Sequence, residues 1–380
     1  MPVGRVPSQS CRGSGPDRPV TSSPGKESTH GHAGRPRRCR HRGRHHKHTH
    51  TAAVVVAATG AMVAQVTVAA TPAGYRQLLK LAGEQPGRRV WAIEGTGGYG
   101  AGLTRFLAAH AEQVVELDRP KRAARRHGAN SDPLDATRAA REALGRDRLA
   151  QPRAAGQRAA LSVRLAARRS AVQATTDAQR QLHALVVAAP QAIRERLRRL
   201  TTPRLVSTCG RLRQQTTWDT ETTTVAASLR AVARRIQLLD AEIAEHTRAI
   251  TTLVRAWRPD LLSRTGVGPI VAAIVLCAWS HPGRCGSDAA FAMLGGAAPI
   301  PASSGQTVRV RLNRSGDRHL NQALHVIVLT RLRYDPATRA YAQRRRAQGK
   351  TNREIKRCLV RYVARQLYRQ LEAHPGFDPT

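Results

Sequence analysis

The stretch RRVWAIEGTGGYG, residues 88–100, joins a strand pattern to a glycine-rich turn. Residues 88–95 form a mostly apolar run that predicts a strand, closed by a glycine directly after Glu94. The helical pattern YGAGLTRFLAAH, residues 99–110, follows at once. A strand that leads directly into a helix is typical of an α/β sheet, so this stretch decides the fold class.

The sequence on either side extends the same pattern. Within residues 51–70, the β-rich runs AAVVVAA and MVAQVTV flank a Thr-Gly pair and predict a hairpin. The Thr-Pro pair at 71–72 predicts the cap and first turn of a helix. QVVELD, residues 113–118, predicts a further strand, and SDPLDATRAAREAL predicts a helix with Ser131 as its N-cap. We therefore expect an α/β sheet that begins with a hairpin.

Strand patterns stop after residue 152. Residues 154–200 and 222–257 are long Arg/Ala/Leu-rich helical patterns, separated by a Thr-rich link. They predict either an antiparallel helical hairpin or an intermolecular coiled coil. From Leu261 onward a mixed pattern predicts a second globular unit, with a helix near 287–294 and three basic helices at its end. Those basic helices present either a solvated face or a specific DNA contact.

The formal net charge of +38 is the dominant property of this 380-residue chain. A surface this basic is expected to bind polyanions through phosphate contacts, so nucleic acid is the first partner to consider. Aromatic residues make up only 3%, which argues against a single-strand binder that relies on base stacking. The six cysteines form no CxxC pair, so we expect no zinc site or disulfide framework. Gly60 and Gln65 interrupt the apolar run after the basic leader, which argues against an export signal or membrane span.

Three carboxylates are candidates for a metal site. Glu94 stands at a strand end, where open α/β sheets place ligands. Asp132 and Asp135 lie three residues apart at a helix start and share one face, although such carboxylates also complement a helix dipole. Together they are oxygen ligands of the kind that hold Mg²⁺ for phosphoryl displacement. GTGGYG is a poor dinucleotide motif, because Glu94 occupies the turn position where a glycine is needed.

The segment PIPASSGQTVRVRLNRSGDR, residues 299–318, combines hydroxyls with strong basicity. A serine such as Ser304 can attack a phosphodiester when a neighbour accepts its proton and cations stabilise the developing charge; Asp317 and His319 are candidate acceptors. The alternative is a polar loop whose hydroxyls contact phosphate. The glycines of GVGP resemble helix-hairpin-helix elements or a simple helix-turn-helix connection. The candidate nucleic-acid-binding residues are Gly266, Gly268, Arg309, Arg311, Arg314 and Arg318.

The chain resembles the insertion-sequence transposases of the family conventionally numbered one hundred and ten, relatives of the Piv DNA invertases. The resemblance covers roughly residues 45–372 and rests on WAIEGTGGYG, VVELDRPKRAARRHGANSDPLDATRAA, LLSRTGVGP and LGGAAPIPASSGQTVRVRLNRSGDRHLNQALH. It implies an RNase H-like (RuvC-like) α/β N-terminal domain with a DEDD acid set and a helical coiled-coil spacer. It also implies a mainly α C-terminal domain with a helix-hairpin-helix-like element and a catalytic serine.

By position in this family, Glu94 matches the second acid, and Asp132 and Asp135 match the third and fourth, as catalytic Mg²⁺ ligands. Ser304 matches the nucleophile that cuts and rejoins DNA. The resemblance also implies a structured guide RNA and a place at the nucleoid in the bacterial cytoplasm. Recombination of two DNA ends favours a homodimer or homotetramer, and we expect no membrane contact. The predicted segments are a leader (1–45), expected to be disordered because it is basic and almost without large apolar residues, the RuvC-like domain (46–150), the spacer (151–258) and the transposase domain (259–372).

The start of the chain departs from this family. Its members begin with a strand that carries the first Asp, and aligning residues 46–51 places Arg44 there. No carboxylate occurs between Glu27 and Glu84. A guanidinium would repel Mg²⁺, so we expect a frameshifted leader, with His46 onward surviving from the first strand, and impaired or absent catalysis. Two alternatives stay open: a non-catalytic nucleic-acid-binding protein, and a RuvC-like nuclease in which Ser304 is dispensable.

Overall fold

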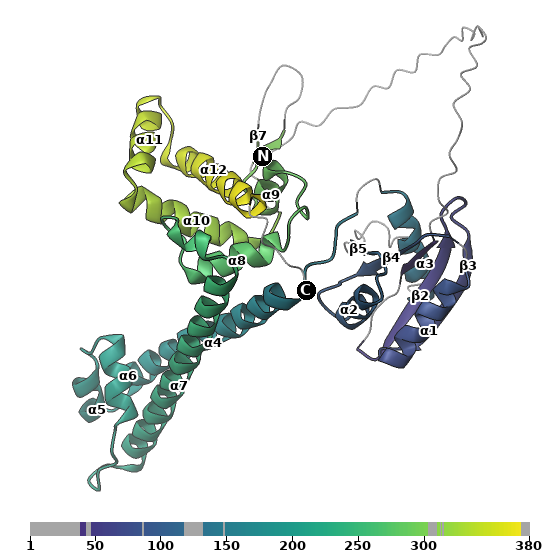
Figure 1. Ribbon diagram of the computed structural model, residues 1–380. Helices are drawn as coiled ribbons and strands as arrows, with labels where there is room; N and C mark the ends of the chain where they lie inside the picture. Colours follow the sequence, from purple (N-terminus) through teal and green to yellow (C-terminus); the bar gives the residue numbers. More distant parts are fainter. Residues whose placement is uncertain are drawn as a thin grey trace, which may run out of the picture.

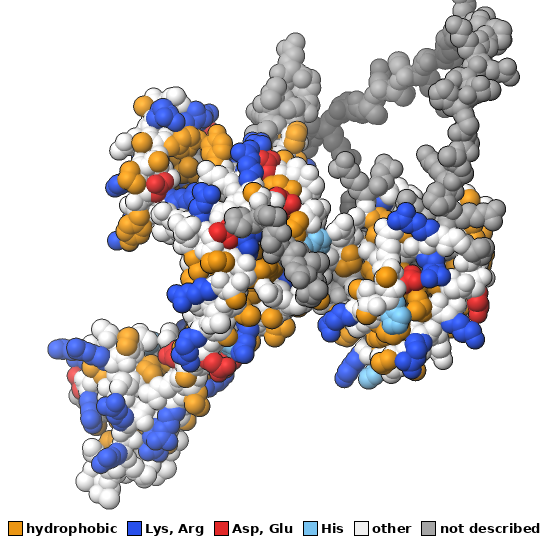
Figure 2. Space-filling view, viewed as in Figure 1, with side chains coloured by type: hydrophobic (Ala, Val, Ile, Leu, Met, Phe, Trp, Pro, Cys, Tyr) orange, Lys and Arg blue, Asp and Glu red, His pale blue; other side chains and the backbone are white. Residues whose placement is uncertain are grey.

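The computed structural model shows three parts in chain order (Figure 1): an α/β unit, a long helical hairpin and a helical C-terminal unit. The structure describes residues 39–42, 47–85, 87–117, 132–146, 149–302, 310–311, 313 and 315–373. Figure 2 shows Lys and Arg side chains over all three parts, as the net charge predicts. None of the described helices is both long enough and apolar enough to cross a lipid bilayer.

A five-stranded sheet forms the α/β unit. Its strands are β1 (Cys39–Arg42), β2 (Thr49–Val56), β3 (Met62–Ala69), β4 (Arg89–Glu94) and β5 (Val114–Leu117), in the spatial order β3-β2-β1-β4-β5. The first three strands pair antiparallel, whereas β4 runs parallel to both β1 and β5. The hairpin turn contains Gly60 at φ +68°, a conformation that favours glycine. The predicted α/β sheet and the hairpin within residues 51–70 are thus confirmed, but the strand β1 precedes this hairpin.

Helices cover both faces of this sheet. Trp91 and Ile93 of β4 pack in a cluster with residues of α1 (Pro72–Gly83) and α2 (Ala101–Ala109). Val90 and Ala92 pack in a second cluster with α3 (Asp132–Leu144). Because successive side chains of a strand point to opposite faces, a strand buried on both sides has a continuous apolar run. The predicted cap of α1 is also confirmed, since the Thr71 hydroxyl accepts a hydrogen bond from Gly74 N at 3.3 Å.

β1 corrects one expectation. Residues 39–42, CRHR, fall in the leader that was expected to be disordered, yet they pair with both β2 and β4 in the middle of the sheet. The residues from Thr49 therefore belong to the second strand and not to the first. A four-residue strand without an alternating apolar pattern gives no strand signal in the sequence, which explains the error.

The spacer is a hairpin within one chain. Its arms are α4 (Gly156–Ala188) and α7 (Thr220–Trp257), which pack against each other along their length (Figure 1). At the far end, α5 (Gln191–Leu197) and α6 (Thr202–Gly210) complete a small core that includes Leu182, Leu205 and Leu229. Pro190 ends the first predicted helix early, because proline cannot continue a helix from within.

The core of the C-terminal unit lies around α8 (Pro269–Trp279), where Trp279 and Phe291 are fully buried, and it continues into the adjoining ends of α4 and α7 through Leu161, Ile250 and Val254. Its remaining elements are the 3-10 helix η2 (Pro259–Ser263), α9 (Asp288–Leu294), the short strands β6 (Ile300–Pro301) and β7 (Val310–Arg311), α10 (Arg318–Tyr334), α11 (Pro336–Ala347) and α12 (Asn352–Glu372). The predicted helix near 287–294 and the three final helices are confirmed as α9, α10, α11 and α12.

Candidate functional site

Glu94 lies where the parallel strands end. It is the last residue of β4, is half-buried, and pairs in register with Leu117, the last residue of β5. The chain then turns at Gly95, which has φ +67°, and enters α2. In this turn the Thr96 hydroxyl is buried and has no hydrogen-bond partner among the described residues. The strand end therefore offers a carboxylate and an unsatisfied hydroxyl two positions apart.

The two aspartates lie on α3, which packs against β1, β2 and β4. Asp135 is half-buried in the first turn of this helix, whereas the side chain of Asp132, like Ser131, lies outside the described residues. The structure thus brings the helix that carries both aspartates onto the sheet that carries Glu94. Within the described part of the chain, no three His, Cys, Asp or Glu residues form a group that could hold a metal ion.

Ser304, Arg309 and Arg314 lie outside the described residues. The loop that carries Ser304 leaves and rejoins the described structure at a two-stranded sheet, in which Ile300 pairs with Arg311 and Pro301 with Val310. The base of this loop is therefore defined by β6 and β7, even though its tip is not described.

Asn313 fixes the chain that follows this hairpin. Its side chain is 5% exposed, and its amide nitrogen donates to the Met293 carbonyl at 3.1 Å. Its amide oxygen accepts hydrogen bonds from the backbone N–H and hydroxyl of Ser315, at 2.9 and 2.6 Å. One buried side chain thus joins the end of α9 to the turn before α10.

Two further hydrogen bonds hold the end of α9 against the turn before α10 and the first residues of that helix. Together these segments form one packed wall. Asp317 N donates to the Leu294 carbonyl at 2.7 Å, and Asn321 Nδ2 donates to the Gly295 carbonyl at 2.7 Å. Gly316 has φ +104°, and a Cβ on it would lie 2.4 Å from Leu294 O. The motifs LGG, 294–296, and NRSGD, 313–317, are therefore packed against each other.

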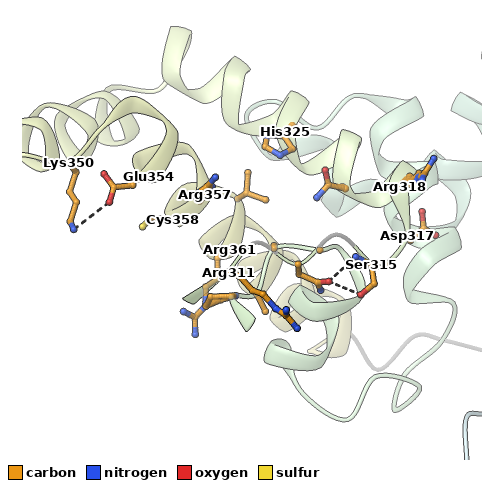
Figure 3. A pocket seen from close by; sticks show the side chains of 18 of the residues that line it. Arg311, Ser315, Asp317, Arg318, His325, Lys350, Glu354, Arg357, Cys358 and Arg361 are labelled. Carbon is orange, nitrogen blue, oxygen red and sulfur yellow. Dashed lines mark hydrogen bonds and ion pairs between the residues drawn. The ribbon is translucent and has the colours of Figure 1, made fainter. Parts of the chain in front are cut away.

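A cavity of about 710 Å³ lies beside this wall, between α10 and α12 (Figure 3). α10 contributes Arg318, Asn321 and His325, which are spaced to share one helix face. Two of the predicted nucleic-acid-binding residues, Arg311 and Arg318, thus come together in one site. Further polar lining side chains, which the sequence did not predict, come from α11, α12 and the turn between them: Arg345, Lys350, Glu354, Arg357, Cys358 and Arg361.

The cavity is strongly cationic. Its two carboxylates are already engaged: Asp317 caps α10 by accepting from His319 N at 2.8 Å, and Glu354 accepts from Thr351 N at 2.8 Å. Hydrogen bonds from Thr351 lower the pKa of Glu354, so this carboxylate stays ionised in its capping box. Among the described residues, these lining arginines have no acidic partner: Arg311, Arg318, Arg357 and Arg361.

His325 differs from the other basic residues of the cavity. Burial, and next the nearby Lys356, lower the pKa of its imidazole below the usual value. The ring is therefore neutral at pH 7 and presents one donor and one acceptor nitrogen. The cavity combines cationic side chains with this uncharged hydrogen-bonding group.

The remaining predicted residues have structural roles in the described fold. Gly266 has φ +85°, and a Cβ on it would lie 3.0 Å from the Ile327 carbonyl, so it lets the loop approach α10 closely. Gly268 is the N-cap residue of α8 and faces open space. The 3-10 helix η2 precedes them, and the helix-hairpin-helix element stays a prediction. His319 contacts Arg169 of α4.

Comparisons with known proteins give two family matches, one over the α/β unit and the first arm of the spacer, and one over the C-terminal unit. A DEDD-type transposase model of IS110 matches residues 45–189, and a model described as transposase IS116/IS110/IS902 family matches residues 259–343. An uncharacterized 42 kDa protein of insertion element IS900 from Mycobacterium paratuberculosis is 32% identical over 165 residues, 41% of this chain and 39% of that protein. An uncharacterized 43.6 kDa protein of insertion element IS110 from Streptomyces coelicolor is 31% identical over 156 residues, 41% of this chain and 37% of that protein. The chain thus spans about two fifths of the length of these curated relatives.

Proposed function

The chain belongs to the IS110 family of transposases, and from this we propose that it acts in cutting and rejoining DNA strands at the ends of an insertion sequence. The observation that carries the proposal is the cationic cavity beside the hairpin base from which the Ser304 loop extends. Cations next to a nucleophile stabilise the charge that develops on a phosphodiester under attack. The RNase H-like fold implied by the DEDD model suits the mixed sheet with Glu94 at its strand ends.

Glu94, Asp132 and Asp135 are the proposed ligands of a divalent cation, which the DEDD family uses and which we propose to be Mg²⁺. The oxygen donors at the end of β4 suit this ion, since Glu94 is half-buried there and the Thr96 hydroxyl lacks a partner among the described residues. When bound, such an ion offsets negative charge on a phosphate oxygen. α3 brings Asp135 onto the same sheet.

Ser304 is the proposed nucleophile. Its Oγ forms a bond to phosphorus while the bond from phosphorus to the leaving sugar oxygen breaks, and the hydroxyl proton passes to that oxygen. A serine–phosphate link of this kind conserves the energy of the phosphodiester, so the reverse attack rejoins a strand. Arg311, which follows the loop in β7, lies in the cavity that would face the substrate phosphates.

Arg44 bears on activity and lies outside the described residues. By position in the family it stands where the first Asp of the acid set is expected. A fixed positive charge near the carboxylates would weaken cation binding. We therefore propose that the chain as written catalyses joining weakly or not at all.

The proposed partners follow from the charge and from the reaction. A formal net charge of +38 suits DNA and a structured guide RNA, and both contacts should weaken as salt rises. Two DNA ends have to meet in recombination, which favours a homodimer or homotetramer.

The test is strand joining on a plasmid that carries the element ends with their flanking DNA, in the presence of Mg²⁺. We expect little joining by the chain as written and more by Arg44→Asp. In the Arg44→Asp background, Ser304→Ala and Glu94→Gln should abolish joining, while Ser303→Ala is the matched control that retains it. Cutting that survives Ser304→Ala would favour the nuclease alternative. DNA binding without any cutting by Arg44→Asp would favour the non-catalytic alternative.

A further inference from the structure

We propose that the cavity between α10 and α12 binds a single unpaired nucleotide, which it holds through the phosphate. The proposal deepens the transposase function, on which it relies for the source of the nucleotide, whereas the site itself is argued from the cavity. Such a site would recognise a base that has left its duplex, or a free mononucleotide.

The shape of the cavity favours a ligand of this size. Two helices form opposite walls, and the backbone of residues 296–299 and strand β7 close a third side (Figure 3). Its volume of about 710 Å³ falls within the range of sites that enclose small molecules and cofactors. A paired base cannot leave its stack to enter a recess between two helices, whereas an unpaired or extruded base can. Duplex DNA is therefore expected only at the rim.

The charges favour a phosphate group. Arg318 projects from α10, and Arg357 and Arg361 from α12, and none of them has an acidic partner in the described structure. Arginine binds phosphate oxygens with two parallel N–H donors, which makes it better suited than lysine to a fixed phosphate position. By contrast, Arg365 and Arg369, farther along the same helix, are engaged with Asp288. Two guanidinium groups of α12 that have no acidic partner in the described structure, those of Arg357 and Arg361, thus lie at the cavity.

The uncharged side chains of the cavity suit a base. His325 and Asn321 lie on the same face of α10, and Cys358 of α12 also lines the cavity. Imidazole and amide groups both offer donors and acceptors of the kind that a base edge presents. No Phe, Tyr or Trp is among the described lining residues, so binding is expected to depend on the phosphate and on salt more than on stacking. This agrees with the low aromatic content of the chain.

The experiment uses the full chain without Mg²⁺, so that binding is measured apart from joining. The probes are a paired duplex, the same duplex with one unpaired 2-aminopurine, and adenosine monophosphate as competitor. The readout is the ratio of affinities for the unpaired and the paired duplex, because loss of any basic residue weakens both. A rise of 2-aminopurine fluorescence on binding reports that the base has left its stacked neighbours, because stacking quenches it and the described lining offers no aromatic ring.

The variants are Arg361→Ala, the conservative Arg361→Lys, and the matched control Arg353→Ala, an exposed arginine on α12 that does not line the cavity. We expect Arg361→Ala to lower the ratio about tenfold, which corresponds to one charge-assisted hydrogen-bonded contact. Arg361→Lys should lower it by less, and Arg353→Ala should leave it within about twofold of the parent. Unchanged thermal unfolding would show that the variants are folded.

The two probes distinguish the two possible sources of the nucleotide. Competition by adenosine monophosphate that is lost in Arg361→Ala identifies a free nucleotide as a ligand, and a preference for the unpaired duplex identifies a nucleotide within a strand. The proposal is wrong if neither probe responds to Arg361→Ala, or if Arg353→Ala has the same effect. Failure of the Arg44→Asp chain to cut or join DNA with Mg²⁺ would instead count against the transposase function and leave this site intact.

Discussion

The side-chain amide of Asn313 donates a hydrogen bond to the Met293 carbonyl at 3.1 Å, across a separation of 20 positions in the chain. This contact holds the turn after β7 against the end of α9, and it forms one wall of the cationic cavity. Leaving a buried amide without its hydrogen-bond partner costs free energy of folding, so the two segments that Asn313 joins should move together as a rigid unit. The position of Arg318, which follows this turn, is thereby fixed.

Gly316→Ala should destabilise the C-terminal unit. The new Cβ would meet Leu294 O at 2.4 Å, in a residue held at φ +104°. We expect a loss of about 3 kcal/mol or more in the free energy of unfolding, from backbone strain and the clash. Gly349→Ala is the control, since Gly349 has φ +79° with open space around it and should cost only about 1 kcal/mol. Urea titration of both variants measures the difference, and equal losses would contradict the packed wall.

Asp260→Ala should be costly because it leaves a buried guanidinium without its carboxylate. Arg258 is 7% exposed, donates to both oxygens of Asp260 at 2.7 and 2.8 Å, and also donates to the Leu371 carbonyl. Removing one partner of a buried pair costs about 3 to 5 kcal/mol. Asp177→Ala breaks an exposed pair with Arg180 and should change stability by less than about 0.5 kcal/mol. Thermal unfolding followed by circular dichroism compares the two variants, which should differ by several degrees.

His50 should make the stability of the α/β unit depend on pH. The residue is 1% exposed and stacks on Tyr75 with ring centroids 5.6 Å apart, and burial lowers the pKa of its imidazole. Since the unfolded chain takes up the proton first, stability is fully present above the unfolded pKa of about 6.5 and is lost as the pH falls below it. His50→Phe keeps a buried ring that cannot titrate. Unfolding at pH 7.5 and 5.5 should show a smaller loss for the variant, and an equal loss would assign the effect to other groups.

Cys209 should resist alkylation in the native protein. Its side chain is fully buried, and burial raises the pKa of the thiol to about 11, so little reactive thiolate exists at pH 8. Iodoacetamide labelling followed by peptide mass spectrometry should find this cysteine unmodified in buffer and modified in denaturing urea. Rapid labelling in buffer would mean that the tip of the spacer hairpin, where α6 carries Cys209, opens easily.

The sequence predicted the elements whose apolar pattern reflects their own burial. The run around Trp91 signalled a strand, and the Thr-Pro pair at 71–72 signalled the start of a helix. β1 gave no such signal, because its position follows from backbone pairing with β2 and β4 and not from apolar side chains. The apolar pattern of the sequence therefore predicts elements that bury their own side chains. It does not predict a strand whose place is set by backbone pairing with its neighbours.

The cavity shows the same limit for the site. Arg311 and Arg318 were predicted from a basic run, but Arg357 and Arg361 belong to a helix far along the chain. Their helical spacing was visible, yet an arginine-rich helix predicts a solvated face equally well. Only the packing of α10 against α12 gathers them around one space. Ser304, Arg309 and Arg314 lie outside the described residues, and their roles stay predictions.

The central place of β1 has a consequence for aggregation. The antiparallel pair β2-β3 and the parallel pair β4-β5 meet within the described sheet only through these four residues. Without them, β2 and β4 would each present an unpaired row of backbone donors and acceptors, flanked by apolar side chains such as Val54 and Ile93. Exposed edges of this kind recruit strands from other molecules. By pairing with both β2 and β4, this short polar strand thus keeps their backbone groups from pairing with strands of another copy of the chain.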